Sequence, residues 1–425
     1  MSIFTELKQK LYTALTEINT DQGIVQLVVE TTLVAEDTDL LGWLKENITY
    51  PHFFWKNRSA ELTFASIGQV RQFSTLESAQ QFSQQTGYNL FGGIKFECEC
   101  RFILPRIVIT KTKAKLTTYL YIDTTQLAEE KQQSEIAINS LDTIQQLTTP
   151  HYQILDHESV TDFTTWKSNI EKAIQAIRAN QFSKVVLANA STLTFNQSLS
   201  AYDLLIISQQ KNLGCYHFLW SEKAESAFIG SSPEKLYQRN EQQFYTEALA
   251  GTVAVTSDPQ QTERNGMWLL SDSKNIHENQ LVVDNIYHHI KDSIEDIQVS
   301  KAEIKRLHNV QHLRRNIQAT LKKGVSDADC LERIHPTAAV AGLPRLLAKQ
   351  FIAENERFKR NWYAGTLGYF NPAHAEFSVA LRSAQIEKNK ITLYAGAGIV
   401  EGSDPESEWQ EIERKSLAMA SLFVK

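Results

Sequence analysis

The stretch Cys215–Val255, CYHFLWSEKAESAFIGSSPEKLYQRNEQQFYTEALAGTVAV, decides the fold class. Its runs 215–222 and 227–233 predict a hairpin-like pair of strands, and residues 244–255 predict a further strand. Strands that follow one another in this way do not alternate strictly with helices. This arrangement argues against a doubly wound parallel sheet and predicts an α+β layered fold.

Outside this stretch, strands and amphipathic helices alternate irregularly. Strands are expected at 23–34, 60–68, 101–110, 117–125, 184–193, 363–370, 375–387 and 391–400. Helices are expected at 1–18, 75–87, 124–148, for about five turns from residue 161, and at 201–212, 266–290, 300–322, 342–355 and from residue 405. The whole chain therefore fits the same α+β class.

The chain has 425 residues, more than the roughly 250–300 at which a single core stops growing. No repeat and no Gly/Ser- or Pro-rich linker divides it, so one interleaved unit is favoured over two separate domains. The net charge of −6 gives no electrostatic reason to bind nucleic acid or an anionic membrane. No apolar run approaches the ~18–20 residues of a membrane span, and the N-terminal stretch is not typical of a signal peptide, so a cytoplasmic location is expected.

Cysteine and histidine spacing does not predict a zinc site. The four cysteines lack paired metal-ligand spacing and are interpreted as reduced thiols: Cys98, Cys100, Cys215 and Cys330. His308 and His312 stand four apart, but Asn309 occupies the glutamate place of the H-E-x-x-H motif. A solvated helix face is the better interpretation.

A lysine opens the expected strand KVVLANA, residues 184–190. Period-2 alternation puts Lys184 on one face with Val186, Ala188 and Ala190. Burial on such a face lowers a lysine pKa, by up to ~3–5 units when complete, and allows a general base at neutral pH. The alternative is a strand-edge lysine in water.

Glu234 follows Ser232 and Pro233, a cap residue and an N1 proline that predict a short helix beginning here. A carboxylate at a helix start usually only compensates the helix dipole. The alternative role is a general acid, which needs a raised pKa.

Two expected helices carry glutamates that could bind a metal. Glu278 lies mid-helix, four residues after Lys274. Glu411 lies three residues after Glu408 and four before Lys415. Pairs at i, i+4 predict surface salt bridges. The alternative is that glutamates of two helices converge on an oxygen-only site suited to Mg²⁺.

The stretch YAGAGIVEG, residues 394–402, does not predict a dinucleotide site, because Glu401 stands at the third glycine position of G-x-G-x-x-G. Its small residues can still expose backbone N–H groups to an anion, and Arg382 could bind a carboxylate with two hydrogen bonds. His335 opens the loop HPTAAVAGLPR, where a structural and a catalytic role are equally open.

Long motifs follow one another from about residue 160 to the end: KVVLAN, GSSPEKLY, EALAGT, SKNIHENQLVVD, HPTAAVAGLPR, WYAGTLGY, FSVALRSA and YAGAGIVEGSDPESEWQEIERK. In this order they resemble the chorismate-utilising family and, within it, the isochorismate synthases. The N-terminal part is similar more loosely, through PHFFWKNR, FGGIKFE and FILPR. The resemblance implies one chorismate-utilising domain over 1–425, with 1–155 less well matched and 160–425 bearing the catalytic motifs. It also implies the fold of anthranilate synthase component I, in which helices flank two β-sheets.

Individual positions distinguish the reactions of this family. Lys184 stands where aminating relatives usually have glutamine, so the resemblance implies water as the nucleophile and no glutaminase subunit. Ala250 stands where aminodeoxychorismate synthases often have a lysine, so a covalent intermediate is not implied. Asn279 after Glu278 is similar to the menaquinone-pathway type.

The resemblance implies a reversible, Mg²⁺-dependent conversion of chorismate to isochorismate, in which water adds at C2 while the C4 hydroxyl departs. Lys184 would be the base and Glu234 the acid. Glu278 and Glu411 would hold Mg²⁺, with Glu408 acting through water. Substrate binding is implied for Arg382, Tyr363, Gly396, Ala397, Gly398, Lys415, Thr252 and His335.

Three alternatives remain at this point. A salicylate synthase shares the lysine and goes on to eliminate pyruvate, and a siderophore-pathway isochorismate synthase makes the same product for another use. A non-catalytic chorismate-binding homologue is the third alternative, but retention of the base, the acid and both metal ligands argues against it.

Overall fold

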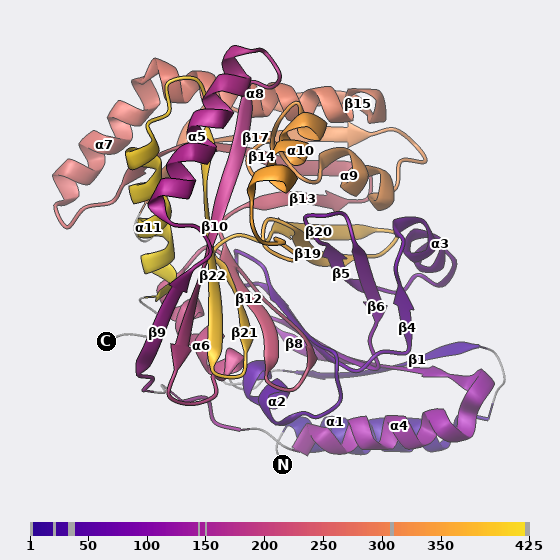
Figure 1. Ribbon diagram of the computed structural model, residues 1–425. Coiled ribbons are helices and arrows are strands. Elements are labelled where there is room, and N and C mark those ends of the chain that lie inside the picture. The colour runs from indigo at the N-terminus through magenta and orange to yellow at the C-terminus, as the bar shows by residue number, and fades with distance from the viewer. Residues whose placement is uncertain are drawn as a thin grey trace.

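This structure, a computed structural model, describes residues 3–19, 23–32, 39–142, 145–148, 151–306 and 310–420. Within them the chain forms two large antiparallel sheets with helices on their outer faces and edges (Figure 1). The predicted α+β class is confirmed. None of the described helices is long and apolar enough to cross a membrane.

The larger sheet has twelve strands in the described residues. Its path runs through β1 (Ile24–Thr32), β8 (Lys115–Asp123), β7 (Ile107–Thr112), β3 (Leu62–Ile67), β2 (His52–Lys56), β11 (Tyr216–Lys223), β12 (Ser226–Ser232), β21 (Ser383–Glu387), β22 (Lys390–Ile399), β10 (Lys184–Phe195) and β18 (Gly342–Leu343). Strand β9 (Ile154–Ser159) pairs with β10 beside this path.

The smaller sheet has ten strands in the same described part of the chain. They follow the order β15 (Ile294–Val299), β17 (Val310–Leu321), β14 (Gln243–Ala254), β13 (Lys235–Asn240), β20 (His374–Val379), β19 (Thr366–Phe370), β5 (Leu90–Ile94), β6 (Cys100–Leu104) and β4 (Arg71–Phe73). Strand β16 (Glu303–Arg306) pairs with β17.

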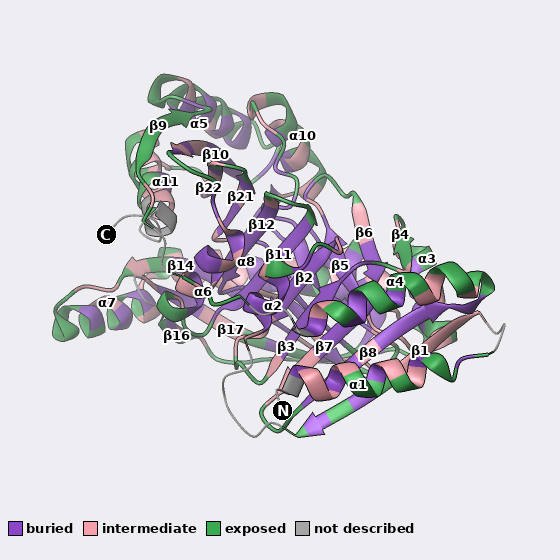
Figure 2. Ribbon diagram, turned by 90° about the horizontal axis from the view of Figure 1, so that it is seen from below, coloured by how far each residue is buried: buried purple, intermediate pink, exposed green. Residues whose placement is uncertain are grey.

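Helices cover the outside of both sheets. They are α1 (Ile3–Thr16), α2 (Leu40–Glu46), α3 (Leu76–Thr86), α4 (Leu127–Asn139), α5 (Phe163–Arg178), α6 (Ala201–Lys211), α7 (Pro259–Ser271), α8 (Ser273–Ile290), α9 (Asp327–Ile334), α10 (Arg345–Asn355) and α11 (Pro405–Ala420). Helices α1 and α4 lie side by side, α8 lies along β14 and β17, and α5 packs beside α11 (Figure 1). Figure 2 shows the buried residues concentrated in the strands, while α4 and α7 carry much exposed surface.

Aromatic side chains fill the space between the sheets. Trp55 of β2 meets Tyr369 of β19 with ring centroids 5.5 Å apart, and Phe53 meets Phe91 at 5.6 Å. The neighbouring residue Phe54 points to the other face and packs with α1, α2 and α6 in a second cluster. The alternation of β2 thus gives the larger sheet two buried faces.

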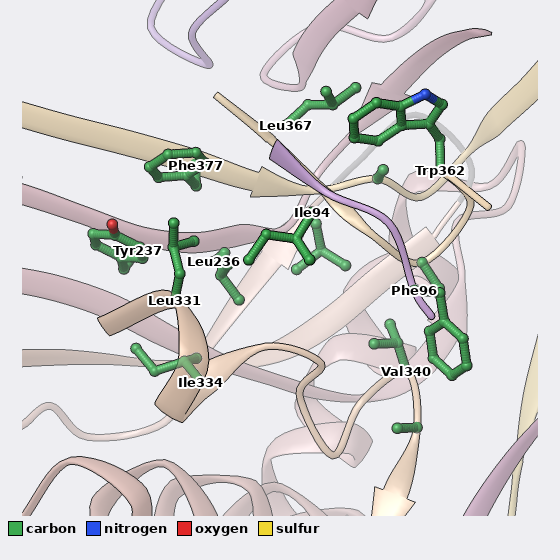
Figure 3. Packing of buried hydrophobic residues seen from close by; sticks show 14 of the residues in the cluster. Ile94, Phe96, Leu236, Tyr237, Leu331, Ile334, Val340, Trp362, Leu367 and Phe377 are labelled. Carbon is green, nitrogen blue, oxygen red and sulfur yellow. The ribbon is translucent and has the colours of Figure 1, made fainter. Parts of the chain in front are cut away.

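The inter-sheet core continues to α9. Leu236 and Tyr237 of β13 belong to the same buried cluster as Leu331 and Ile334 of α9 (Figure 3). The Tyr237 hydroxyl donates to Asp327 Oδ1 at 3.0 Å, which fixes the start of the helix against the strand. The core therefore packs β13 against α9.

Strands β16 and β17 occupy most of the segment 300–322, so the helix predicted there was wrong. Leu313 and Ile317 stand four residues apart, a spacing that fits one face of a helix and one face of a strand equally. Ala319 and Leu321 extend the period of two, and all four side chains are buried. The alternation, not the four-residue step, decided the structure.

Asp272 divides the predicted helix 266–290 into α7 and α8. Its amide donates to the Trp268 carbonyl and closes α7, while its side chain accepts a hydrogen bond of 2.9 Å from the Asn275 amide and caps α8. An aspartate with both functions ends one helix and starts the next. The helix predicted over 124–148 is also shorter, because α4 ends at Asn139 and a 3-10 turn follows over Ser140–Asp142. Residues 143 and 144 of that prediction lie outside the described part.

Pro233 and Glu234 connect β12 of the larger sheet directly to β13 of the smaller sheet, so the short helix predicted after Pro233 was wrong. Ser232 Oγ does accept a hydrogen bond from the Glu234 amide, at 3.2 Å. The Val379 amide, however, donates to the Glu234 carbonyl at 3.1 Å, and pairing with β20 begins at Lys235. Strand pairing wins over the helix, and Glu234 lies at the crossing between the sheets.

Candidate active site

A cavity of about 410 Å³ lies beside the β12–β13 crossing, between the sheets and helices α8 and α11. Eleven of the thirteen residues predicted for the site line it: Lys184, Glu234, Thr252, Glu278, Tyr363, Arg382, Gly396, Gly398, Glu408, Glu411 and Lys415. They come from segments spread over more than half of the chain. The fold thus gathers most of the predicted site at one place.

Lys184 is the first residue of β10, and its side chain is only 8% exposed. Its Nζ donates to Glu278 Oε1 at 3.1 Å, which forms a salt bridge inside the cavity. Gly398 of β22 lies beside it, where a Cβ atom would come within 3.1 Å of Lys184 Cε. The predicted burial of this amine is confirmed, and the absence of a side chain at 398 leaves room for it.

Glu234 is 8% exposed. Burial, reinforced by the negative charge of Glu247, raises the pKa of Glu234 to about 7, against the opposing charges of Lys305, Lys184 and Arg58. Because no helix begins here, a helix dipole does not favour the carboxylate. A carboxyl with this pKa can donate a proton near neutral pH.

Three carboxylates from two helices line the same cavity: Glu278 of α8, and Glu408 and Glu411 of α11. Glu411 accepts a salt bridge from Lys415 at 2.6 Å, as Glu278 does from Lys184. Burial and the negative charge of Glu411 raise the pKa of Glu408. The described residues hold no preformed group of three or more metal-ligating side chains.

This arrangement fits Mg²⁺ by its chemistry. Mg²⁺ prefers oxygen ligands and commonly binds through one or two carboxylates together with water and substrate. The crowding of Glu408 by Glu411 is of the kind that a divalent cation relieves. The contacts to Lys184 and Lys415 each use Oε1, and a carboxylate has a second oxygen with which Glu278 and Glu411 could hold a metal.

Cationic groups and hydroxyl groups complete the wall. Lys415 Nζ donates to the Gly396 carbonyl at 2.7 Å, which ties α11 to β22. The backbone of Arg382 has a φ of +48°, in the left-handed region that residues other than glycine rarely adopt. Tyr363 stacks on Tyr394 with centroids 5.0 Å apart, and burial raises the pKa of Tyr363 to about 12. The tyrosine is therefore a neutral donor, and the arginine is a half-buried cation that lines the same cavity.

The interpretation of His312 as part of a solvated helix face was wrong. It lies in β17 with 9% exposure, lines the cavity, and its Nδ1 is 2.9 Å from Thr252 Oγ1. Burial and the nearby charges of Arg382, Lys415 and Lys305 lower its pKa to about 3. The neutral ring thus orients the Thr252 hydroxyl. His308 lies outside the described residues.

Two predicted substrate-binding residues do not line this cavity. Ala397 alternates with the cavity-lining Gly396 and Gly398 along β22 and is buried in the same hydrophobic cluster as its strand partner Leu187. His335 is buried with Nε2 3.4 Å from the Lys95 carbonyl, beside a second cavity of about 390 Å³ that Arg345 and Lys349 also line. Neither side chain is placed to touch a molecule in the first cavity.

Sequence reasoning missed a buried charged cluster behind Glu234, formed by Arg58, Glu247 and Lys305. Glu247 lies only four residues before Gly251, in the EALAGT motif, but nothing in its spacing marks it. Arg58 lies 189 residues away from it along the chain. Only the fold brings these charges together.

A buried lysine and a buried glutamate line one cavity together with cations and carboxylates, between two antiparallel sheets. This arrangement is suited to an enzyme that carries out acid–base chemistry on a small anion. The particular family follows from comparison with known proteins. Residues 94–424 match the model of the chorismate binding enzyme family. The isochorismate synthase MenF of Pasteurella multocida is 43% identical over 411 residues, which cover 96% of this chain and 94% of that protein. The MenF of Escherichia coli is 39% identical over 429 residues and 99% of both chains.

Solved structures agree with these relatives. The menaquinone-specific isochorismate synthase MenF from Escherichia coli superposes with a TM-score of 0.94 at 38% identity, covering 99% of each chain. Anthranilate synthase component I from Streptococcus pneumoniae has a TM-score of 0.67 at 18% identity over 96% of each chain and shares the fold. The chain therefore belongs to the chorismate-binding enzymes, in the branch of the MenF isochorismate synthases.

Proposed function

We propose that this protein converts chorismate reversibly to isochorismate, with Mg²⁺, for menaquinone biosynthesis. The observation that carries the proposal is that a buried lysine, Lys184, and a buried glutamate with a pKa near 7, Glu234, line one cavity together with groups that can hold a dianion. Membership in the family indicates that chorismate is the substrate, and the residues that line the cavity indicate acid–base chemistry.

Lys184 Nζ takes a proton from a water molecule, and the oxygen of that water bonds to C2 of chorismate. The ring double bonds shift, the C4–oxygen bond breaks, and Glu234 gives its proton to the departing hydroxyl. One water is consumed and one is released, so no redox cofactor is required. Each proton transfer is expected to contribute about 10²–10⁴-fold to the rate.

The contact between Lys184 and Glu278 orients the amine for this role. Lys184 Nζ donates to Glu278 Oε1 at 3.1 Å, which holds the amine at the cavity wall. Residues Glu278 and Glu411, with Glu408 through water, would hold Mg²⁺, which when bound neutralises the ring carboxylate of the substrate and orients it.

The other carboxylate of the substrate needs a separate set of partners. Arg382, Tyr363 and the backbone at Gly396 and Gly398 are proposed to hold the enolpyruvyl carboxylate, and Lys415 adds positive charge beside them. Thr252, oriented by His312, is proposed to contact the substrate as well. We further propose that the protein acts without a glutaminase subunit, binds neither nucleic acid nor membrane, and works in the cytoplasm.

Product analysis tests this function. Purified protein is incubated with chorismate and MgCl₂, and the products are separated by chromatography and compared with those of Glu234→Gln. Isochorismate from the wild type alone, with the same equilibrium mixture reached from either compound, is the expected result. Salicylate together with pyruvate would identify the salicylate synthase instead, and no conversion by the wild type would overturn the proposal.

A further inference from the structure

The residues on either side of Glu234 are held by one buried cluster. Arg58, in the turn between β2 and β3, donates from Nη1 to the Pro233 carbonyl at 2.8 Å. Lys305 of β16 donates to the same carbonyl at 2.5 Å. The amide of Lys235, on the other side of Glu234, donates to Glu247 Oε1 at 3.0 Å.

Glu247 links these contacts. Its carboxylate, 1% exposed, accepts from Arg58 Nη1 at 2.6 Å and Nη2 at 3.1 Å, and lies 3.4 Å from Lys305 Nζ. Arg314 of β17 lies 3.9 Å from its second oxygen. The paired arginine hydrogen bonds fix the carboxylate in both direction and distance.

The cluster does not itself face the substrate cavity. Glu247, Arg58 and Lys305 do not line the cavity as the described residues form it, whereas Pro233 and Glu234 do. The three charges converge instead on the peptide groups that flank Glu234. The shortest route from the cluster to the cavity therefore runs through Glu234.

We propose that Glu247 is a positioning residue for the general acid: with Arg58 and Lys305 it fixes the Pro233–Lys235 crossing so that the Glu234 carboxyl faces the cavity. The inference rests on the proposed role of Glu234. It assigns a task to a buried ion pair that would otherwise serve stability alone.

The charges of the cluster also act on Glu234 directly. Burial raises the pKa of Glu234 most, and the negative charge of Glu247 raises it further. The positive charges of Lys305, Lys184 and Arg58 lower the pKa of Glu234. Although burial favours its neutral form, the charges of Arg58 and Lys305 hold the pKa of Glu247 itself below its ordinary value, so it remains charged. Removal of Glu247 thus leaves two cations uncompensated near Glu234, and removal of Arg58 leaves one carboxylate less compensated.

Two variants with opposite charge changes test the proposal. Glu247→Gln is expected to lower kcat by about tenfold to a hundredfold, with KM for chorismate changed less than about threefold. It should move the limb of the kcat/KM pH profile that Glu234 sets to lower pH, because Glu234 loses its proton more readily. Arg58→Gln should also lower kcat but move that limb to higher pH.

Asp327→Asn is the matched control, because it breaks the buried ion pair of Asp327 with Arg239, away from the cavity. It should lower the unfolding midpoint without moving the limb, with kcat within about twofold of wild type. A Glu247→Gln enzyme that loses stability as this control does, but keeps the wild-type kcat and limb, overturns the proposal. If Glu247→Gln does not fold, Arg58→Gln decides, and an unmoved limb again overturns it.

An infrared titration of the free enzyme separates this inference from the proposed function. The carboxylic acid band that disappears in Glu234→Gln reports the protonation of Glu234 without any turnover. We expect it to titrate at lower pH in Glu247→Gln and at higher pH in Arg58→Gln. Unchanged titration in both refutes the inference, whereas failure of the wild type to make isochorismate refutes only the proposed function.

Discussion

The buried acid Glu234 should make the protein less stable at neutral pH, and Glu234→Gln should recover that stability while losing activity. The pKa of Glu234 is raised from its ordinary value of 4.5 to about 7. At 1.36 kcal/mol per unit this corresponds to about 3 kcal/mol. The folded state binds this proton more tightly than the unfolded state, so the destabilisation is absent well below pH 4.5, grows as pH rises, and is complete above about pH 7.

Urea unfolding at pH 8 and pH 5 measures this difference. At pH 8 Glu234→Gln should be more stable than wild type by about 3 kcal/mol, equivalent to roughly 3 °C in melting temperature for a chain of this length. At pH 5 the gain should shrink to less than about 1 kcal/mol. Glu413→Gln, at an exposed glutamate of α11, is the control and should change stability by less than about 0.5 kcal/mol at either pH.

Glu234→Gln should also turn chorismate over at least about 100-fold more slowly in both directions, because the reverse reaction needs Glu234 as a base. A Glu234→Gln protein with wild-type stability at both pH values would show that the carboxyl is not held neutral by burial. A fully active variant would remove Glu234 from the mechanism.

Further predictions concern the rest of the cavity. Lys184→Ala and Lys184→Gln should both lose at least about 100-fold in kcat while still binding chorismate, since neither side chain can accept the proton of water; near wild-type turnover by either would exclude Lys184 as the base. Glu278→Ala and Glu411→Ala should raise the Mg²⁺ concentration needed for half-maximal activity by at least about tenfold, whereas Glu413→Ala should not, and full activity of wild type in excess chelator would rule out the metal site. Gly398→Ala should lower kcat while leaving the unfolding midpoint close to that of wild type, because the new Cβ would lie 3.1 Å from Lys184 Cε. An unchanged kcat would show that the lysine side chain can shift to make room for the methyl group.

Much of the fold could be predicted, because its clearest elements follow one period. The helix from residue 163 repeats its apolar residues at three- and four-residue steps, and the strands of the Cys215–Val255 stretch alternate between faces. The segment 300–322 failed because Leu313 and Ile317 satisfy both periods. The expected helix after Pro233 failed for a different reason, since cap residues describe a local preference and the partner strand β20 is supplied by the tertiary structure.

The site could be predicted only in part. Lys184 and Glu278 are 94 residues apart, and their spacing does not indicate that they meet. The family motifs predicted that both residues belong to one site, and in the structure both line one cavity. The cluster at Glu247 could not be predicted, because each of its charges is unremarkable in sequence and the effect depends on burial beside Pro233 and Glu234.

The origin of the new hydroxyl group tests the central claim most directly. The protein is incubated with chorismate and Mg²⁺ in water enriched in oxygen-18, and the isochorismate is analysed by mass spectrometry early in the reaction. If Lys184 activates water and Glu234 releases the old hydroxyl, the product carries one heavy oxygen atom, at C2. Isochorismate without the label would mean that the hydroxyl group migrates within the substrate, and the roles given to both residues would be contradicted.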